Sequence, residues 1–203
     1  MNLDFIEVGT SDFDSLLQSS KENAKGISIE PLQEYLDRLP SKKNIFKVCK
    51  GISDKRIPSA IIYYIPPRII EHLKLPDWLK GCNSFFKKHL QHKIYEEYVA
   101  CDCVEIVRFV DIVNEFKVSS VKLLKLDCEG HDLVILKSIY NEYIEGLLDV
   151  LPEEILFECY VGDKKEPPYC RDEDLNEVIM KFKSLNYALE KKNHSNYALK
   201  KSL

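Results

Sequence analysis

The chain has 203 residues, 45% of them apolar and 31% charged, and this composition excludes a disordered or collagen-like protein. A chain of this length usually forms one domain and buries enough surface to fold without disulfides or metals, so we expect a single domain over residues 1–203. Twenty-nine Lys and Arg against thirty-three Asp and Glu give a net charge of −4, which argues against a generally basic nucleic-acid binder.

Apolar periodicity alternates between strand-like and helix-like runs along the chain. The predicted strands cover residues 3–8, 26–30, 44–49, 60–65, 103–109, 121–127, 154–160, 187–191 and 197–201. The predicted helices cover residues 12–19, 31–39, 110–117, 131–140 and 172–185. Strands that alternate with helices predict an α/β fold, with a mostly parallel sheet and helices on both faces. The last two strands predict an antiparallel hairpin at the C-terminus.

Residues 66–93 interrupt this alternation with proline, lysine, histidine and aromatic residues. Six Lys and Arg stand here against two acidic residues. Long irregular stretches inside compact domains are often functional, and interleaved aromatic and cationic side chains suit a sugar, a nucleotide-sugar phosphate or a nucleic-acid backbone. We therefore expect an insert or lid that borders an acceptor site; a merely solvated surface segment is the alternative.

The N-terminus, the hydropathy and the cysteines favour a cytoplasmic protein that binds no membrane. No apolar run approaches the roughly 20 residues that span a bilayer. Residues 1–8 include Asp4 and Glu7 and lack the basic segment of a secretory signal. The seven cysteines are scattered, and the close pair Cys101 and Cys103 has no second pair to complete a zinc site. Most thiols are therefore expected to be reduced.

The loop after the first predicted strand has features of a cofactor-binding turn. Gly9 permits a tight turn from strand to helix, and Ser11 and Asp12 can cap the helix that follows. The dinucleotide fingerprint needs three glycines, but only Gly9 is present, and Phe13 stands where a small residue is required. This loop therefore disfavours NAD and FAD. S-adenosylmethionine has no pyrophosphate, so one glycine and polar partners are sufficient for it.

The second predicted strand ends in Glu30, 21 residues after Gly9. A carboxylate at this position can accept hydrogen bonds from both hydroxyls of an adenosyl ribose. Alternatively, Gly9 is only a turn residue and Glu30 only a charge favourable to the helix dipole. The two residues at this spacing on consecutive strands favour a nucleoside site.

Residues 121–137, VKLLKLDCEGHDLVILK, resemble the FkbM family of S-adenosylmethionine-dependent methyltransferases, whose pattern is an apolar strand, LLKIDVEGAE and a helix ending in VLKG. Four shorter segments, residues 29–31, 51–54, 108–113 and 152–158, resemble other parts of that pattern. The resemblance extends from Phe5 to the terminal hairpin. The chain departs from the pattern at Phe13 and Ser138, where the family often has glycine.

The resemblance implies a Rossmann-like class I methyltransferase fold that binds S-adenosylmethionine. The candidate cofactor-binding residues are Glu7, Gly9, Thr10, Ser11, Glu30, Pro31, Ser53 and Asp127. The candidate catalytic residues are Asp127, Glu129 and His131, any of which could remove the proton of an acceptor hydroxyl. No metal is expected; a divalent cation held by Asp127, Glu129 and Asp132 is the alternative.

We expect an O-methyltransferase that acts on a hydroxyl of a carbohydrate, either a glycan or a nucleotide-sugar, or of another small molecule. The cations of residues 66–93 would suit an anionic acceptor. An RNA or DNA methyltransferase is one alternative, and its acceptor binding would depend strongly on salt. A non-catalytic binding module that retained the fold is the other alternative, and it would show no turnover.

Overall fold

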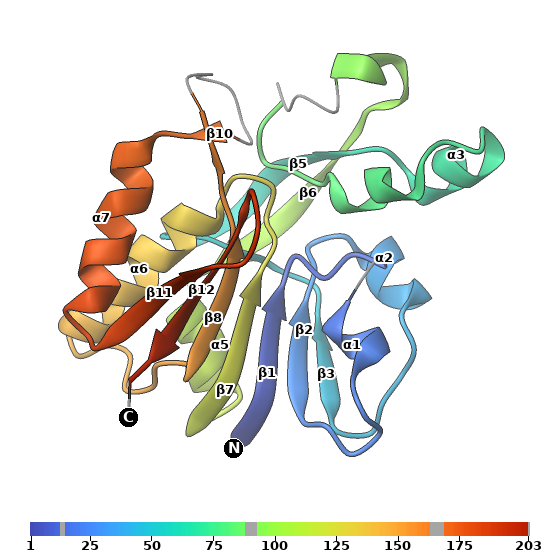
Figure 1. Cartoon of the computed structure of the whole chain (residues 1–203). Coiled ribbons are helices and arrows are strands. Elements are labelled where there is room, and N and C mark those ends of the chain that lie inside the picture. Colours follow the sequence, from blue (N-terminus) through green and yellow to red (C-terminus); the bar gives the residue numbers. More distant parts are fainter. Residues whose placement is uncertain (13–14, 88–92, 163–168, 203) are drawn as a thin grey trace.

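A seven-stranded sheet forms the centre of the computed structural model, which describes residues 1–12, 15–87, 93–162 and 169–202 (Figure 1). Its strands are β1 (Asn2–Val8), β2 (Gly26–Ile29), β3 (Ile45–Val48), β7 (Ser120–Leu126), β8 (Glu154–Glu158), β11 (Tyr187–Lys191) and β12 (Asn196–Lys201). The strand order is β11-β12-β8-β7-β1-β2-β3. All pairs from β8 to β3 are parallel, whereas β12 is antiparallel to β8 and β11. The predicted parallel sheet and terminal hairpin are confirmed.

Helices cover both faces of this sheet, as the sequence predicts (Figure 1). The helices α5 (Phe109–Glu115), α6 (Asp132–Ile144) and α7 (Asp172–Lys183) pack on one face, and α1 (Leu16–Ser19) and α2 (Gln33–Arg38) pack on the other. Acidic residues in the first turn of α7 and lysines in its last turn match its dipole. None of the helices in the described residues is long and apolar enough to cross a bilayer.

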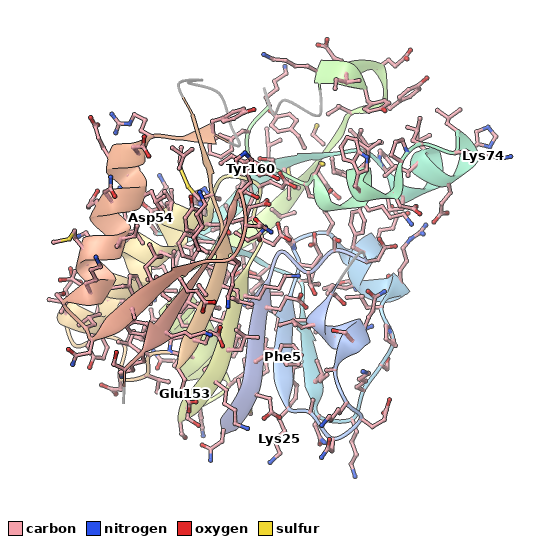
Figure 2. The ribbon with its side chains drawn as sticks, in the orientation of Figure 1. Phe5, Lys25, Asp54, Lys74, Glu153 and Tyr160 are labelled. Atoms are coloured by element: carbon pink, nitrogen blue, oxygen red, sulfur yellow. A yellow bond between two sulfur atoms is a disulfide. The ribbon has the colours of Figure 1, made fainter. Side chains whose placement is uncertain are left out.

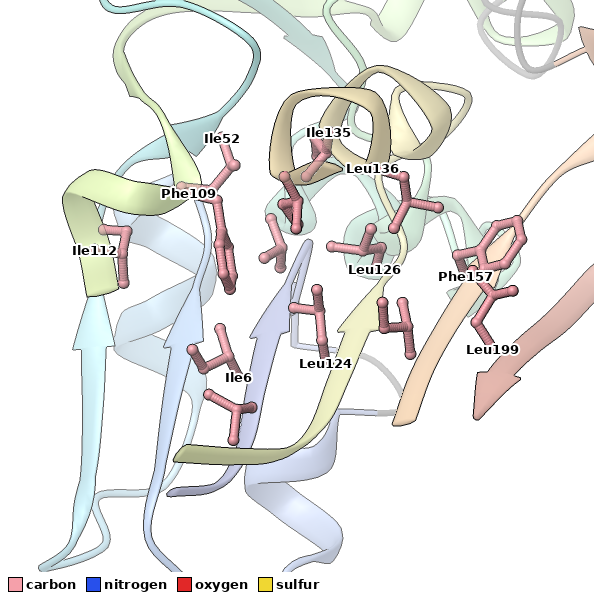
Figure 3. Close-up of a cluster of buried hydrophobic side chains, with 14 of the residues drawn as sticks. Ile6, Ile52, Phe109, Ile112, Leu124, Leu126, Ile135, Leu136, Phe157 and Leu199 are labelled. Carbon is pink, nitrogen blue, oxygen red and sulfur yellow. The ribbon is translucent and has the colours of Figure 1, made fainter. Parts of the chain in front are cut away.

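Neighbouring strand residues supply the cores on the two faces, because successive side chains of a strand point in opposite directions. Ile6 of β1 and Leu124 of β7 belong to the core beneath α5, α6 and α7. The preceding residues, Phe5 and Leu123, pack against the core beneath α1 and α2. Figure 3 shows Ile6 and Leu124 on the side of the sheet where Phe109 begins α5. Burial on both faces explains why these strands read as nearly continuous apolar runs.

A second, three-stranded sheet contains two of the predicted strands. Its order is β4-β6-β5, with β4 (Gly51–Ile52), β5 (Ile57–Tyr64) and β6 (Ala100–Val107). The predicted strands at residues 60–65 and 103–109 therefore pair with each other in antiparallel fashion and lie outside the central sheet. Both are half exposed, and this is consistent with one covered face rather than two.

The described part of residues 66–93, which we call the insert, is partly helical. It contains α3 (Pro67–His72) and the 3₁₀ helix η1 (Asp77–Gly81); a second 3₁₀ helix, η2 (Glu96–Tyr98), follows it. Pro67 at the first position of α3 needs no N–H partner there. Ile65, Ile70 and Leu79 form a small buried cluster of their own. In Figure 1 the insert lies beyond the ends toward which the arrows of the parallel strands of the central sheet point.

Two cysteines form a bond that the sequence did not predict. Cys159 and Cys170, 11 residues apart, form a disulfide where β9 (Tyr160–Val161) pairs with β10 (Tyr169–Cys170). The remaining five cysteines are thiols, so the expectation of mostly reduced cysteines is confirmed for them alone. The pairing depends on the parallel contact between β9 and β10, and the cysteine spacing gave no sign of it.

Candidate active site

The strands β1, β2, β7 and β8 end at the same edge of the sheet because they are parallel. The strand order reverses between β1 and β7, and ligands of such sheets bind outside this point. Figure 2 shows Tyr160 at this edge and Lys25 and Glu153 at the opposite one. A pocket with about 450 Å³ of empty space, part of it open to solvent, lies here. Its lining residues are Val8, Gly9, Ser11, Glu30, Pro31, Lys50, Gly51, Ile52, Ile62, Gly81, Asn83, Phe85, Asp127 and Cys128.

Gly9 makes the tight turn after β1 possible. Its φ is +81°, and a Cβ at this position would lie 1.9 Å from the backbone oxygen of Asp127. The Gly9 N–H donates to the oxygen of Ile29, and the Asp127 N–H donates to the oxygen of Val8. The ends of β1, β2 and β7 are therefore joined at one point, and only glycine fits there.

Glu7 and Thr10 stabilise this turn through hydrogen bonds. Glu7 is fully buried, accepts the Thr10 hydroxyl at 2.6 Å and accepts the Leu16 N–H at 2.8 Å. Lys125 lies 3.2 Å from the same carboxylate. Neither Glu7 nor Thr10 lines the pocket. Their contacts support the turn, and their role in cofactor binding stays a prediction.

The cap of α1 differs from the prediction. The sequence suggested Ser11 or Asp12, but the helix begins at Leu16, and the Ser15 hydroxyl accepts the Gln18 N–H at 3.1 Å. Ser11 instead has a φ of 40° and lines the pocket. Phe13, the departure from the family pattern, lies outside the described residues.

Glu30 lies at the end of β2 with its carboxylate buried in the pocket wall. Its side chain accepts the Ser11 N–H at 3.0 Å and the Leu32 N–H at 3.1 Å. Burial raises its pKa to about 7. Each carboxylate oxygen has two acceptor positions, so Glu30 can still accept hydrogen bonds from ligand hydroxyls. Pro31 lines the pocket beside it.

Three carboxylates meet beyond the ends of β7 and β8. The oxygens of Asp127, Glu129 and Glu158, which we call the carboxylate cluster, lie within 4.8 Å of one another. Burial and then the charge of Glu129 raise the pKa of Asp127 to about 7. Burial and then the charge of Glu158 raise the pKa of Glu129 to about 8. Groups in this arrangement could share protons, hold a divalent cation or accept hydrogen bonds from hydroxyls.

Glu158 was not among the predicted site residues. Its side chain accepts the Ser195 hydroxyl at 3.1 Å, so the terminal hairpin helps to hold it. One feature of the sequence could have pointed to Glu158: it is a polar residue at the end of a buried strand, and ligands of parallel sheets bind beyond such strand ends.

Asp132 was considered as a cation ligand, but it has a structural place. It is almost fully buried, and its oxygens accept the Cys128 N–H at 3.1 Å and the Glu158 N–H at 3.3 Å. This side chain therefore connects the loop after β7 to the end of β8. The third carboxylate of the cluster is Glu158 instead.

His131 precedes α6 and contacts both the loop after β4 and the insert. Its Nε2 lies 2.9 Å from the hydroxyl oxygen of Ser53. The ring centroids of Phe85 and Phe86 lie 5.6 Å and 6.2 Å from that of the imidazole. Burial lowers the pKa of His131. Ser53, predicted to bind the cofactor, does not line the pocket and instead contacts the candidate base.

The insert forms one wall of the site. Gly81, Asn83 and Phe85 line the pocket. The Ser84 hydroxyl donates to the backbone oxygen of Glu129 at 3.4 Å, and Ser84 exchanges two backbone hydrogen bonds with Tyr63 of β5. These contacts place the described part of the insert next to the carboxylate cluster. Residues 88–92 lie outside the described residues.

The pocket has the features that S-adenosylmethionine requires. Glu30 has acceptor positions that ribose hydroxyls could use, and the close turn at Gly9 leaves room beside the backbone. Ile52, Ile62 and Phe85 provide an apolar wall suited to a flat base. The predicted residues that the structure brings together around the pocket are Gly9, Ser11, Glu30, Pro31 and Asp127.

Comparison with known proteins identifies the family of the chain. A family model described as "Methyltransferase FkbM domain" matches residues 7–189. No curated protein matches the chain. Among solved structures, the chain is similar to magnesium protoporphyrin IX methyltransferase (ChlM) from Synechocystis PCC 6803 with bound SAM, at 6% sequence identity and a TM-score of 0.44. That likeness covers 99% of this chain and 71% of the other.

Proposed function

The chain belongs to the FkbM methyltransferase family and is an S-adenosylmethionine-dependent methyltransferase, and from that premise we propose that it methylates a hydroxyl of a carbohydrate or another small molecule. The carbohydrate would be a glycan or a nucleotide-sugar. The observation that supports this acceptor is the carboxylate cluster beside the cofactor pocket. Carboxylates accept strong hydrogen bonds and can take two neighbouring hydroxyls at once.

On this proposal, the turn after β1 and Glu30 hold the cofactor. Glu30 accepts hydrogen bonds from the ribose, and the backbone around Gly9 and Ser11 faces the amino-acid part. When bound, S-adenosylmethionine supplies an activated methyl group on a sulfonium. The contribution of the protein is then mainly alignment of the methyl group with the acceptor oxygen.

The carboxylate cluster would bind and orient the acceptor. Hydroxyls of the acceptor donate to Asp127, Glu129 and Glu158; Asp127 also lines the pocket, so this arrangement would put the acceptor next to the cofactor. The reacting hydroxyl must also lose its proton. His131 and the cluster residues are the candidates to take it.

The insert would cover the acceptor. Its cations give it a surplus of positive charge, six Lys and Arg against two acidic residues, in a chain with a net charge of −4. Such a field would attract an anionic acceptor such as a nucleotide-sugar. We place this activity in the cytoplasm, where nucleotide-sugars are available as small soluble acceptors.

The test is a transfer assay with radiolabelled S-adenosylmethionine and the full chain. A panel of methyl glycosides, oligosaccharides and nucleotide-sugars is offered, with total RNA and DNA in separate reactions. We expect the label in an alkali-stable methyl ether of one carbohydrate. Asp127→Asn, which keeps the shape of the side chain, should lower the initial rate by about 100-fold, the usual scale for a positioned polar group.

A matched variant separates a site effect from general damage. Asp37→Asn changes an exposed residue of α2 and should transfer at the wild-type rate. Label in RNA or DNA would identify a nucleic-acid methyltransferase instead. An alkali-labile ester, or full activity of Asp127→Asn, would contradict the proposed hydroxyl chemistry or the proposed role of the cluster.

A further inference from the structure

A serine hydroxyl connects His131 to a carboxylate on the loop after β4. The Ser53 Oγ donates to the Asp54 Oδ1 at 2.9 Å and lies 2.9 Å from the His131 Nε2. Ser53 is buried, and Asp54 is exposed. His131 is 78 residues away in the sequence, so this contact exists only in the folded chain.

The protons that Ser53 and Asp54 can donate determine the tautomer of His131. A hydroxyl has one proton, and an ionised carboxylate can only accept. The Ser53 proton therefore goes to Asp54, and the second contact of Ser53 requires a proton on Nε2. In a neutral imidazole the other nitrogen, Nδ1, then carries a lone pair.

The surroundings of the ring disfavour protonation of this lone pair. Burial lowers the pKa of His131; the charge of Asp54 opposes this, and that of Lys55 adds to it. From the insert, the aromatic rings of Phe85 and Phe86 pack near the imidazole. Nδ1 is buried and has no hydrogen-bond partner among the described residues.

An unsatisfied buried acceptor lowers the stability of a fold, and a catalytic role is one explanation for such a group. Phe85, whose ring packs near the imidazole, also lines the pocket, so His131 lies behind the pocket wall.

We propose that Asp54 is a positioning residue that acts through Ser53 to hold His131 as the Nε2–H tautomer, so that Nδ1 takes the proton of the acceptor hydroxyl. This inference rests on the proposed function, since it needs a hydroxyl acceptor. In the step, the acceptor O–H bond breaks and its proton moves to Nδ1. The O–CH₃ bond forms as the S–CH₃ bond breaks, and that electron pair stays on sulfur.

The first experiment reads the tautomer without any acceptor. The full chain is labelled with ¹⁵N-histidine, and His131→Gln identifies the His131 signals among the five histidines. We expect neutral His131 with the proton on Nε2 at pH 7.5. Asp54→Ala should shift the population toward Nδ1–H, because the Ser53 hydroxyl then donates to Nε2. Asp54→Asn still offers an acceptor oxygen and should keep the wild-type tautomer.

The tautomer result is independent of the methyl acceptor, so it stands even if no carbohydrate is methylated. A wild-type chain with Nδ1–H, or with charged His131 at pH 7.5, would overturn the inference. The same spectrum in Asp54→Ala and wild type would also overturn it, because Asp54 would then have no influence on the ring.

The second experiment uses the labelled-methyl assay with whichever acceptor it identifies. Asp54→Ala should lower kcat by about tenfold or more, the scale of one positioned proton acceptor, with the KM for S-adenosylmethionine unchanged. For Asp54→Asn, kcat should stay within about threefold of the wild-type value. The acidic limb of its pH–rate profile should move to lower pH, because the variant lacks the charge of Asp54 that raises the pKa of His131. Full kcat in Asp54→Ala, despite a shifted tautomer, would exclude Nδ1 as the proton acceptor.

Discussion

At the scale of single residues, the candidate site contains carboxylates whose pKa values are raised, mainly by desolvation. Burial raises the pKa of Glu30 and of Asp127 to about 7, and that of Glu129 to about 8. Such groups favour ligand binding over stability, because each ionised carboxylate in the pocket costs folding free energy.

This cost predicts how the stability depends on pH. The folded-state pKa values of Asp127 and Glu129 lie above their unfolded values, so the folded chain binds their protons more tightly. Their contribution to stability is full below about pH 4 and is lost as the pH rises through about 7 to 8. Glu129→Gln removes this loss. It should raise the free energy of unfolding by about 1–3 kcal/mol at pH 8.5 and change it little at pH 5.

Urea denaturation of the variant at both pH values measures this effect. Glu153→Gln, an exposed carboxylate at the opposite edge of the sheet in Figure 2, is the control and should change neither value. An equal change at pH 5 and pH 8.5 would mean that Glu129 affects packing rather than charge.

Glu30 should determine the affinity for the nucleoside. Glu30→Ala removes the acceptors for the ribose and leaves the N–H groups of Ser11 and Leu32 without their partner. We expect the dissociation constant for S-adenosylhomocysteine to rise by about 10- to 100-fold, the effect of roughly 1.5–3 kcal/mol for hydrogen bonds to a charged group. Calorimetry measures it. Glu34→Ala, exposed on α2, should bind as the wild type does; unchanged affinity in Glu30→Ala would remove Glu30 from the site.

At the scale of elements, the turn between β1 and α1 depends on close approach of the backbone. Two glycines with similar φ values test this, since Gly9 has φ +81° and Gly146 has φ +71°. A Cβ at Gly9 would overlap the backbone oxygen of Asp127 at 1.9 Å, whereas a Cβ at Gly146 would meet nothing within 4 Å. Both substitutions have the conformational cost of a left-handed residue, but only one of them adds the clash.

Gly9→Ala should therefore destabilise the chain by at least about 2 kcal/mol more than Gly146→Ala does, since it forces the ends of β1 and β7 apart. Chemical denaturation followed by circular dichroism gives both values. S-adenosylhomocysteine should bind to Gly146→Ala with wild-type affinity and to Gly9→Ala only weakly. Equal stability of the two variants would show that the turn can relax.

At the scale of the whole molecule, the cofactor pocket is built from segments that are distant in the sequence. Its walls include the ends of β1, β2 and β7, the start of the second sheet and the insert. A ligand here connects the central sheet to the β4-β6-β5 sheet, and binding to the folded chain alone shifts the folding equilibrium.

S-adenosylhomocysteine at 100 times its dissociation constant should stabilise the folded chain by about 2.7 kcal/mol. For a domain of this size, that corresponds to a rise in Tm of roughly 5–11 °C. A thermal scan with and without the ligand measures it, and NAD at the same concentration is the control. A shift with NAD but none with S-adenosylhomocysteine would contradict the assigned pocket.

The sequence by itself determined the central architecture. Strands buried on both faces appear as apolar runs, and helices appear as 3.6-residue periodicity, because burial of each element leaves a local pattern. Gly9 and Glu30 could be singled out as candidates for the same reason, since a tight turn and a strand end have local signatures. The order of these segments also identified the family.

Only the tertiary structure decided which distant groups meet. Residues 60–65 and 103–109 have ordinary strand patterns, but pairing partners are not encoded locally, so the second sheet could not be foreseen. Glu158 joins Asp127 and Glu129, and Cys159 joins Cys170, through contacts between chain segments. The contact of Ser53 with His131 spans 78 residues. Hydrogen bonds and charge interactions depend on distances of a few ångströms, and only the packed chain brings these side chains that close.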